Sequence, residues 1–199
     1  MPLSGRRLLL LAALLAPFAA AAATPGASSN WAADAELDGI VDLLDPDYLR
    51  RPIAVARLPL RYAVTRIHGS GRRHVYSFED PNCSYCRQLT RHLEEIGDVT
   101  VHTFIVTFLG ENSKAKADAV WCARNPPDAW AAVMQRRRQV AAAPGCHAPT
   151  EATRKLVDML GINLTPTIFF ADGTRLNGVR PRAELQARLL AAARHPGAP

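Results

Sequence analysis

The sequence predicts an α/β fold in which helices flank a mixed β-sheet. From residue 60 onward, short runs with strand-like alternation are interleaved with segments of helical periodicity. The 199 residues are 48% hydrophobic and 21% charged, which is typical of one globular domain with some additional length. No internal repeat is found, so a repeat architecture is not expected.

Residues 1–23 predict a secretory signal peptide. Arg6 and Arg7 precede an apolar run, and the alanines at 20–23 offer the small-residue pattern that signal peptidase cleaves. The apolar stretch 8–23 has 16 residues, fewer than the roughly 20 that a spanning helix needs. The twin-arginine pattern is matched poorly, so we expect general secretory export and a periplasmic location.

Residues 24–59 predict an N-terminal extension with one short helix. The first part is rich in Ala, Pro, Gly and Ser, which favours a flexible stub. Apolar residues then recur at helical spacing over 34–44, and Asp45-Pro46 ends the pattern. Pro52 and Pro59 interrupt the stretch after it, and no element is assigned there.

Residues 60–195 predict the main domain. The first half contains a strand at 60–67, a Gly-rich turn, a strand at 74–78 that forms a hairpin with it or lies next to it, a helix at 84–96 and a strand at 99–108. The second half contains helices at 112–123 and 127–140, a loop at 141–149, a helix at 150–160, strands at 167–170 and 175–178 around a turn, and a helix at 181–193.

The net charge of +6 becomes +4 once the two signal-peptide arginines are removed, and this mild excess indicates no particular partner. The run Arg136-Arg137-Arg138 is expected to form a solvated helix face. No aromatic residues or motif accompany it, so a nucleic-acid interface is not expected.

Cys83-Ser84-Tyr85-Cys86 lies where a predicted strand gives way to a predicted helix. At a helix N-terminus, the exposed N–H groups and the macrodipole favour a thiolate, so Cys83 is the expected nucleophile. Cys86 lies one turn further on and is expected to be more buried. Cys83 would attack a substrate disulfide, and Cys86 would resolve the resulting mixed disulfide.

A lone CxxC motif is also half of a zinc site, and Cys122, Cys146 or His147 would be available as further ligands. The spacing argues against zinc, because Cys122 and Cys146 are 24 residues apart and neither belongs to a second close pair. Four cysteines allow three pairings, and an exported protein keeps its disulfides.

The segment 78–89, with the sequence FEDPNCSYCRQL, resembles the active-site segment of the periplasmic disulfide isomerases of the DsbC and DsbG family. Three further stretches resemble that family in the same order: VWCAR at 120–124, GINLTPT at 161–167 and ADGT at 171–174. The resemblance extends over residues 60–193.

This resemblance implies a thioredoxin-like fold with a helical insertion between the central strand and the strand that follows a cis-proline. It implies a cis bond between Thr165 and Pro166, with these two residues and Tyr85 contacting substrate. It also implies a structural disulfide between Cys122 and Cys146, and neither a cofactor nor a metal.

The chain departs from the family in two respects. Family isomerases carry an N-terminal dimerisation domain, and the 37 residues from Thr24 to Leu60 are too few for it, so a monomeric catalytic domain is expected. Thioredoxins place a buried acid six positions before the nucleophile, where this chain has Ser77. Glu79 and Asp80 are near, and the sequence does not decide whether either reaches Cys86.

The first functional hypothesis is a reductase or isomerase that acts on disulfides of exported proteins and is kept reduced by a membrane reductant of the DsbD type. The same fold would also suit a dithiol oxidase or a reductase of sulfenic acids. A hypothesis of another class is a non-catalytic binding module whose cysteines bind zinc or are structural. Substrates, reduction potential and the proton acceptor for Cys86 are not indicated by the sequence.

Overall fold

The computed structural model describes residues 40, 47 and 49–194. The predicted signal peptide and the stub after it lie outside the described residues. So does the predicted helix at 34–44, apart from Ile40.

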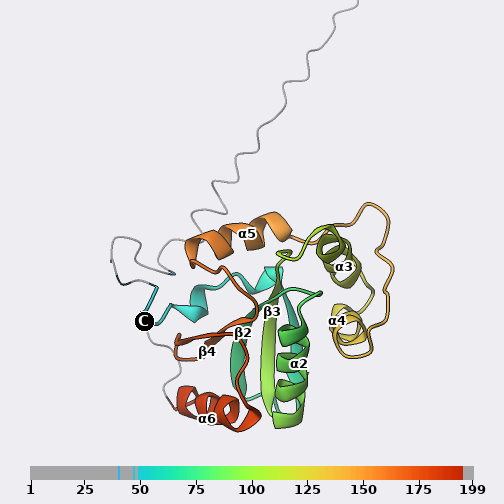
Figure 1. Cartoon of the computed structure of the whole chain (residues 1–199). Helices are drawn as coiled ribbons and strands as arrows, with labels where there is room; N and C mark the ends of the chain where they lie inside the picture. Colours follow the sequence, from blue (N-terminus) through green and yellow to red (C-terminus); the bar gives the residue numbers. More distant parts are fainter. Residues whose placement is uncertain (1–39, 41–46, 48, 195–199) are drawn as a thin grey trace, which may run out of the picture.

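Five strands form one mixed sheet in the order β1-β3-β2-β4-β5 (Figure 1). Their bounds are Ala63–His68 (β1), Arg73–Glu79 (β2), Val99–Ile105 (β3), Thr167–Phe170 (β4) and Arg175–Asn177 (β5). β2 and β3 are parallel, and the other neighbouring pairs are antiparallel. The predicted α/β class is confirmed.

The prediction that the first two strands pair or lie next to each other is wrong, because β3 lies between them. β3 pairs with β1 on one edge, with Ala63 opposite Phe104, and with β2 on the other, with Arg73 opposite Val99. All seven residues of β3 are buried, so this strand needs neighbours on both edges. β1 is partly exposed, which suits the edge of the sheet, and its predicted first residues form a 3-10 turn at Leu60–Tyr62.

The described residues also form five α-helices. They are Ser84–Ile96 (α2), Glu111–Trp121 (α3), Pro126–Met134 (α4), Thr150–Met159 (α5) and Arg182–Ala192 (α6). α2 has the predicted bounds and ends at Gly97, whose φ of 61° suits glycine. α3, α4 and α5 lie between β3 and β4 in the chain, so the predicted helical insertion is confirmed.

The predicted helix at 127–140 is too long, because α4 ends at Met134. Its buried residues stop at Val133 and Met134, and no apolar residue at 135–139 gives a further turn a face to bury. The arginine run at 136–138 therefore lies in a loop and not on a helix.

Helices cover both faces of the sheet (Figure 1). On one face, α2 and α6 pack against side chains such as Val75, Val101 and Ile168. On the other face, α5 and the 3-10 turn Val55–Arg57 pack around Phe78, Phe104 and Phe169, whose rings stack or meet edge to face. Among the described residues, no helix has the length and hydropathy needed to cross a membrane.

The segment before residue 60 contributes to this second face. Ile53 and Val55 are buried in the same cluster as Phe78, and the Ile53 N–H donates to the Gly173 carbonyl at 3.1 Å. Gly173 has a φ of 79°, and an added Cβ would lie 2.2 Å from the Ile53 carbonyl oxygen, so the close approach requires glycine.

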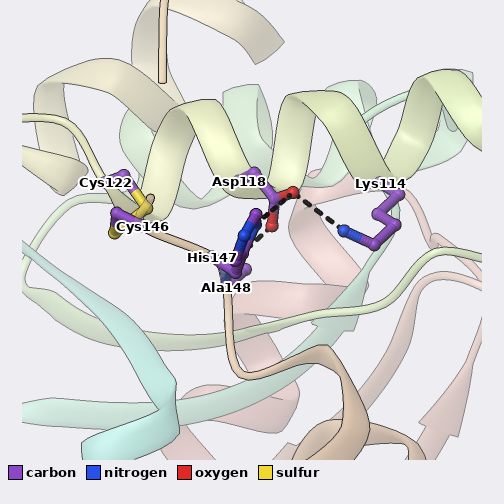
Figure 2. The surroundings of a disulfide bond; sticks show 6 residues. All are labelled: Lys114, Asp118, Cys122, Cys146, His147 and Ala148. Atoms are coloured by element: carbon purple, nitrogen blue, oxygen red, sulfur yellow. Dashed lines mark hydrogen bonds and ion pairs between the residues drawn. A yellow bond between two sulfur atoms is a disulfide. The ribbon is translucent and has the colours of Figure 1, made fainter. Parts of the chain in front are cut away.

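A disulfide joins Cys122, at the end of α3, to Cys146 in the loop before α5 (Figure 2). Next to it, the Asp118 carboxylate accepts hydrogen bonds from the Ala148 N–H at 2.8 Å and from Lys114 Nζ at 2.9 Å. Partial burial opposes ionisation of Asp118, but these donors and His147 lower its pKa. The disulfide and Asp118 together fix the loop to α3.

We expect that replacing both Cys122 and Cys146 with alanine lowers the free energy of unfolding by about 3 to 4 kcal/mol, because the unfolded chain regains the freedom of a long loop. Urea unfolding of the double variant under non-reducing conditions measures this loss. A midpoint equal to that of the parent protein would show that the disulfide does not stabilise the insertion.

Candidate active site

Cys83 is the N-cap of α2, directly after the loop that leaves β2. Its Sγ accepts a hydrogen bond from the Cys86 N–H at 3.3 Å, so the sulfur occupies the position of a capping oxygen. The positive end of the helix macrodipole faces this sulfur, which favours the thiolate.

The pKa of Cys83 is lowered from 9.0 to about 5. The largest cause is a hydrogen bond from the Cys86 thiol. Burial opposes the shift, and a contact with Thr165 and the backbone N–H groups of Cys86 and Tyr85 add to it. At neutral pH, Cys83 is therefore a thiolate, which is the nucleophilic form of cysteine.

The pKa of Cys86 is shifted in the opposite direction. Its side chain is fully buried, and burial raises the pKa of its thiol, as do the hydrogen bond to Cys83 and the negative charges of Glu79 and Cys83. Cys83 and Cys86 are both free thiols in this structure. The pair thus combines one ionised sulfur with one protonated sulfur that donates to it.

The bond between Thr165 and Pro166 is cis, and the loop that contains it lies against Cys83. The Thr165 carbonyl oxygen is 3.4 Å from Cys83 Sγ, close enough to accept a hydrogen bond from the thiol form. The loop is also bound to the residue that follows β5, because the Gly178 N–H donates to the Pro166 carbonyl at 2.7 Å. Segments more than 80 residues apart in the chain meet at this sulfur.

Exposed apolar side chains surround a pocket next to Cys83. We define the apolar rim as Tyr85, Phe108, Leu109 and Leu164, which all line this pocket. Tyr85 is 62% exposed and Leu109 is 52% exposed, although large apolar side chains are usually buried. Cys83 itself is only 5% exposed, so a reaction partner reaches it through this pocket.

Asp80 holds the loop before Cys83 in place. Its buried carboxylate accepts hydrogen bonds from the Asn82 N–H at 2.7 Å, the Ser113 hydroxyl at 2.8 Å and the Leu109 N–H at 2.9 Å. One side chain thereby connects the cysteine loop, the start of α3 and the apolar rim.

We expect that Asp80→Ala lowers the free energy of unfolding by about 3 kcal/mol, because two backbone N–H groups and the Ser113 hydroxyl lose a buried acceptor. The control is Asp158→Ala, which removes a half-exposed ion pair with Arg154 and should cost less than about 0.5 kcal/mol. Thermal or urea unfolding of the two variants compares them. Equal losses would contradict the role of Asp80.

Glu79 is a second buried acid, and it lies behind the cysteines. Its carboxylate accepts hydrogen bonds from Ser77 at 2.6 Å and from Thr103 at 3.3 Å, and Arg66 Nη2 lies 3.9 Å away. Burial raises the pKa of Glu79, while the Arg66 charge and the hydrogen bonds oppose the shift. Ser77, at the position where thioredoxins carry an acid, therefore serves as a donor to this glutamate.

The structure brings together Cys83, Cys86, Thr165, Pro166 and Tyr85, all of which the sequence singles out. Three features were not evident from the sequence: the organising role of Asp80, the Arg66–Glu79 pair and most of the apolar rim. The available signal was the pair Phe108-Leu109, which lies at the end of the predicted strand 99–108 and beyond the end of β3 at Ile105, where a loop is normally polar. Two of the further zinc ligands considered from the sequence, Cys122 and Cys146, are bonded to each other and are therefore not available to a metal.

The fold and this site define a member of a known class. Residues 60–193 match the thioredoxin-like domain family, and the chain belongs to that family.

Within this family, the chain is similar to thiol:disulfide interchange proteins, which confirms the resemblance seen in the sequence. It is 43% identical over 132 residues to a probable thiol:disulfide interchange protein DsbC of Bordetella parapertussis, covering 66% of this chain and 47% of that protein. It is 30% identical over 105 residues to DsbG of Escherichia coli, covering 48% and 42% of the two chains.

A solved structure agrees with these similarities. The crystal structure of a disulfide interchange protein from Neisseria gonorrhoeae superimposes with a TM-score of 0.63 at 28% identity, covering 68% of this chain and 99% of that one. The thioredoxin-like fold is thereby confirmed. The chain spans about half the length of the curated relatives that it matches.

Proposed function

We propose that the protein is a thiol-disulfide oxidoreductase, a reductase or isomerase, that acts on disulfides of exported proteins through Cys83 and Cys86. The observation that carries this proposal is the placement of Cys83 at a helix N-terminus beside a cis-proline loop, where the Cys86 N–H donates to its sulfur and its pKa is lowered to about 5. A low pKa favours a nucleophilic cysteine, because the thiolate is the form that reacts, whereas a structural cysteine gains nothing from it.

The proposed reaction consists of two consecutive thiol–disulfide exchange steps. The Cys83 thiolate attacks one sulfur of the substrate disulfide, a bond forms between them, and the other substrate sulfur leaves as a thiolate and takes up a proton. Cys86 then loses its proton and attacks the Cys83 sulfur, which releases the second substrate thiol. Two electrons have moved from the dithiol to the substrate, and the Cys83–Cys86 pair is left as a disulfide.

Glu79 is the proposed acceptor of the Cys86 proton. It is completely buried, its charge is felt by the Cys86 thiol, and its raised pKa suits a group that takes up a proton. Asp80 is less suited, since its carboxylate is occupied by two N–H groups and a hydroxyl.

The substrate is proposed to bind as an extended segment beside Thr165 and Pro166. A strand placed there would bring its cysteine to Cys83, and its neighbouring apolar side chains would contact Tyr85 and the rest of the apolar rim. An unfolded or partly folded protein offers such segments.

We also propose a domain organisation and a cellular location for the protein. Residues 1–23 would direct export to the periplasm, 24–59 would form an extension, and 60–195 would act as a monomeric catalytic domain. A membrane reductant of the DsbD type would restore the dithiol after each reductive cycle. No nucleic acid is proposed to take part.

A dithiol oxidase is a second candidate, and the low pKa of Cys83 favours it. The folded-state pKa lies below the unfolded one, so the thiolate stabilises the reduced protein. This contribution is fully present above pH ~8.5 and is lost as the pH falls toward about 5. A stabilised dithiol makes the corresponding disulfide more oxidising.

Two measurements test these functions. The purified, reduced protein should catalyse reduction of insulin by dithiothreitol and rearrangement of a protein with scrambled disulfides. An absence of both activities, with the dithiol intact, would refute the proposal. In cells quenched with acid, alkylation should show Cys83 and Cys86 as thiols, whereas a resting disulfide would favour the oxidase.

A further inference from the structure

A second groove lies beside the cysteine loop and carries a strong positive charge. It is lined by residues of α2, α3, α4 and the loop that follows α4. Its charged side chains are Arg87, Lys116, Arg137, Arg138 and Glu111, which give four positive charges and one negative charge, or +3 in sum. We call it the basic groove.

Among the residues that the structure describes, no carboxylate forms an ion pair with the four cations of the basic groove. Arg87 Nη1 donates to the Asn82 carbonyl at 3.3 Å, and Lys116 Nζ donates to Asn82 Oδ1 at 2.5 Å, and both acceptors are neutral. The Arg137 and Arg138 side chains have no hydrogen bond or ion pair with any residue that the structure describes.

Some arginines elsewhere in the chain form ion pairs with acids. Arg154 binds Glu151 and Asp158, and Arg188 binds Glu184. Cations that converge without acids repel one another, and an anionic ligand relieves this repulsion.

The loop after α4 is folded so that both arginines reach the groove. Arg137 has a φ of 50°, in the left-handed region that residues with a Cβ seldom adopt. The Arg138 N–H donates to the Ala132 carbonyl at 2.9 Å, which fixes the loop against α4. The backbone of both arginines is therefore fixed where these residues line the groove.

Consecutive residues of the chain line the basic groove and the pocket at Cys83. Pro81 lines the basic groove, while the next two residues, Asn82 and Cys83, line the pocket with the apolar rim. Arg87 and Lys116 also hold Asn82 directly. A polypeptide whose cysteine lies at Cys83 therefore has the basic groove within reach of its neighbouring residues.

We propose that the basic groove binds an acidic segment close to the target cysteine of the substrate, and so selects among disulfide-bearing proteins. This inference rests on the proposed function and adds a substrate class to it. An acidic peptide suits the groove better than a nucleic acid, since none of the described residues that line it is an aromatic that could stack on a base.

A binding experiment tests the groove separately from the redox chemistry. A fluorescent, cysteine-free peptide rich in Asp and Glu should bind the wild-type protein saturably at low salt. We expect Arg137→Glu/Arg138→Glu to weaken binding by about tenfold or more, and the neutral pair Arg137→Gln/Arg138→Gln to lie in between. The control is Arg57→Glu/Arg194→Glu, which makes the same charge change at exposed sites outside the groove.

Three binding results would overturn the proposal. The first is an absence of binding to the wild-type protein. The second is an equal loss of binding in the groove variant and the control variant. The third is displacement of the peptide by a single-stranded oligonucleotide of equal charge at lower concentrations than by unlabelled peptide.

An exchange experiment then tests substrate selection. Two peptides with the same activated disulfide carry either acidic residues or their amides next to the cysteine. The acidic peptide should react about tenfold faster at low salt, and the advantage should shrink at high salt and vanish in Arg137→Glu/Arg138→Glu. Equal rates for the two peptides overturn the groove proposal alone, whereas absence of reaction with both overturns the proposed function.

Discussion

Replacing Cys83 with serine is expected to lower the rate of disulfide exchange by at least about 1000-fold, because the hydroxyl of serine is not ionised near neutral pH. No other described cysteine replaces it: Cys86 is fully buried with a raised pKa, and Cys122 and Cys146 are bonded to each other. Insulin reduction and the reaction with an activated disulfide both measure the loss.

This substitution should leave the fold intact. Serine is among the preferred N-cap residues, so its oxygen can accept the Cys86 N–H in place of the sulfur. Urea unfolding near pH 5, where the thiolate contributes little to the stability of the reduced parent protein, should give a free energy within about 1 kcal/mol of that protein. Activity above a tenth of the wild-type value in the well-folded variant would contradict the assignment of Cys83 as nucleophile.

Replacing Cys86 with serine is expected to stop multiple turnover while leaving the first exchange in place. Cys83 still attacks the substrate, but no second thiol resolves the mixed disulfide, so one substrate stays bound per protein. Non-reducing electrophoresis should show this adduct, and dithiothreitol should release it. Continued turnover of the variant at the wild-type rate, without an adduct, would contradict the proposed resolving role.

A comparison of two variants at position 86 separates this role from the effect on Cys83. The Cys86 thiol is the largest cause of the low pKa of Cys83. Serine keeps a donor there, whereas Cys86→Ala removes it, so the pKa of Cys83 should rise further in the alanine variant. Equal pKa values in the two variants would show that the side chain at 86 does not stabilise the thiolate.

Elements with a clear local signal were predictable from the sequence. The bounds of α2 and β4 follow from apolar spacing and from Gly97 and Pro166 beside them. The position of β3 between β1 and β2 was not predictable, because strand order depends on contacts between distant segments. α4 was predicted too long, since helix propensity alone does not show where a buried face ends.

The candidate site also contains both residues that were predictable from the sequence and residues that were not. Cys83, Cys86, Thr165 and Pro166 were found through short motifs that carry their chemistry in the residue types. The roles of Asp80 and the Arg66–Glu79 pair depend on hydrogen bonds across β1, β2, β3 and α3, which no short motif encodes. The basic groove was not predicted, because its arginine run was expected to form the solvated face of a helix.

The most direct test of this account is the titration of the Cys83 thiol in the reduced protein. Ultraviolet absorbance of the thiolate, or the rate of alkylation by iodoacetamide, should follow one transition with a midpoint near pH 5. The alkylation rate should then stay constant from pH ~7 upward, since the thiol is already ionised. A midpoint near ~8.5, the value of an ordinary cysteine, would contradict the central claim that Cys83 is a stabilised thiolate.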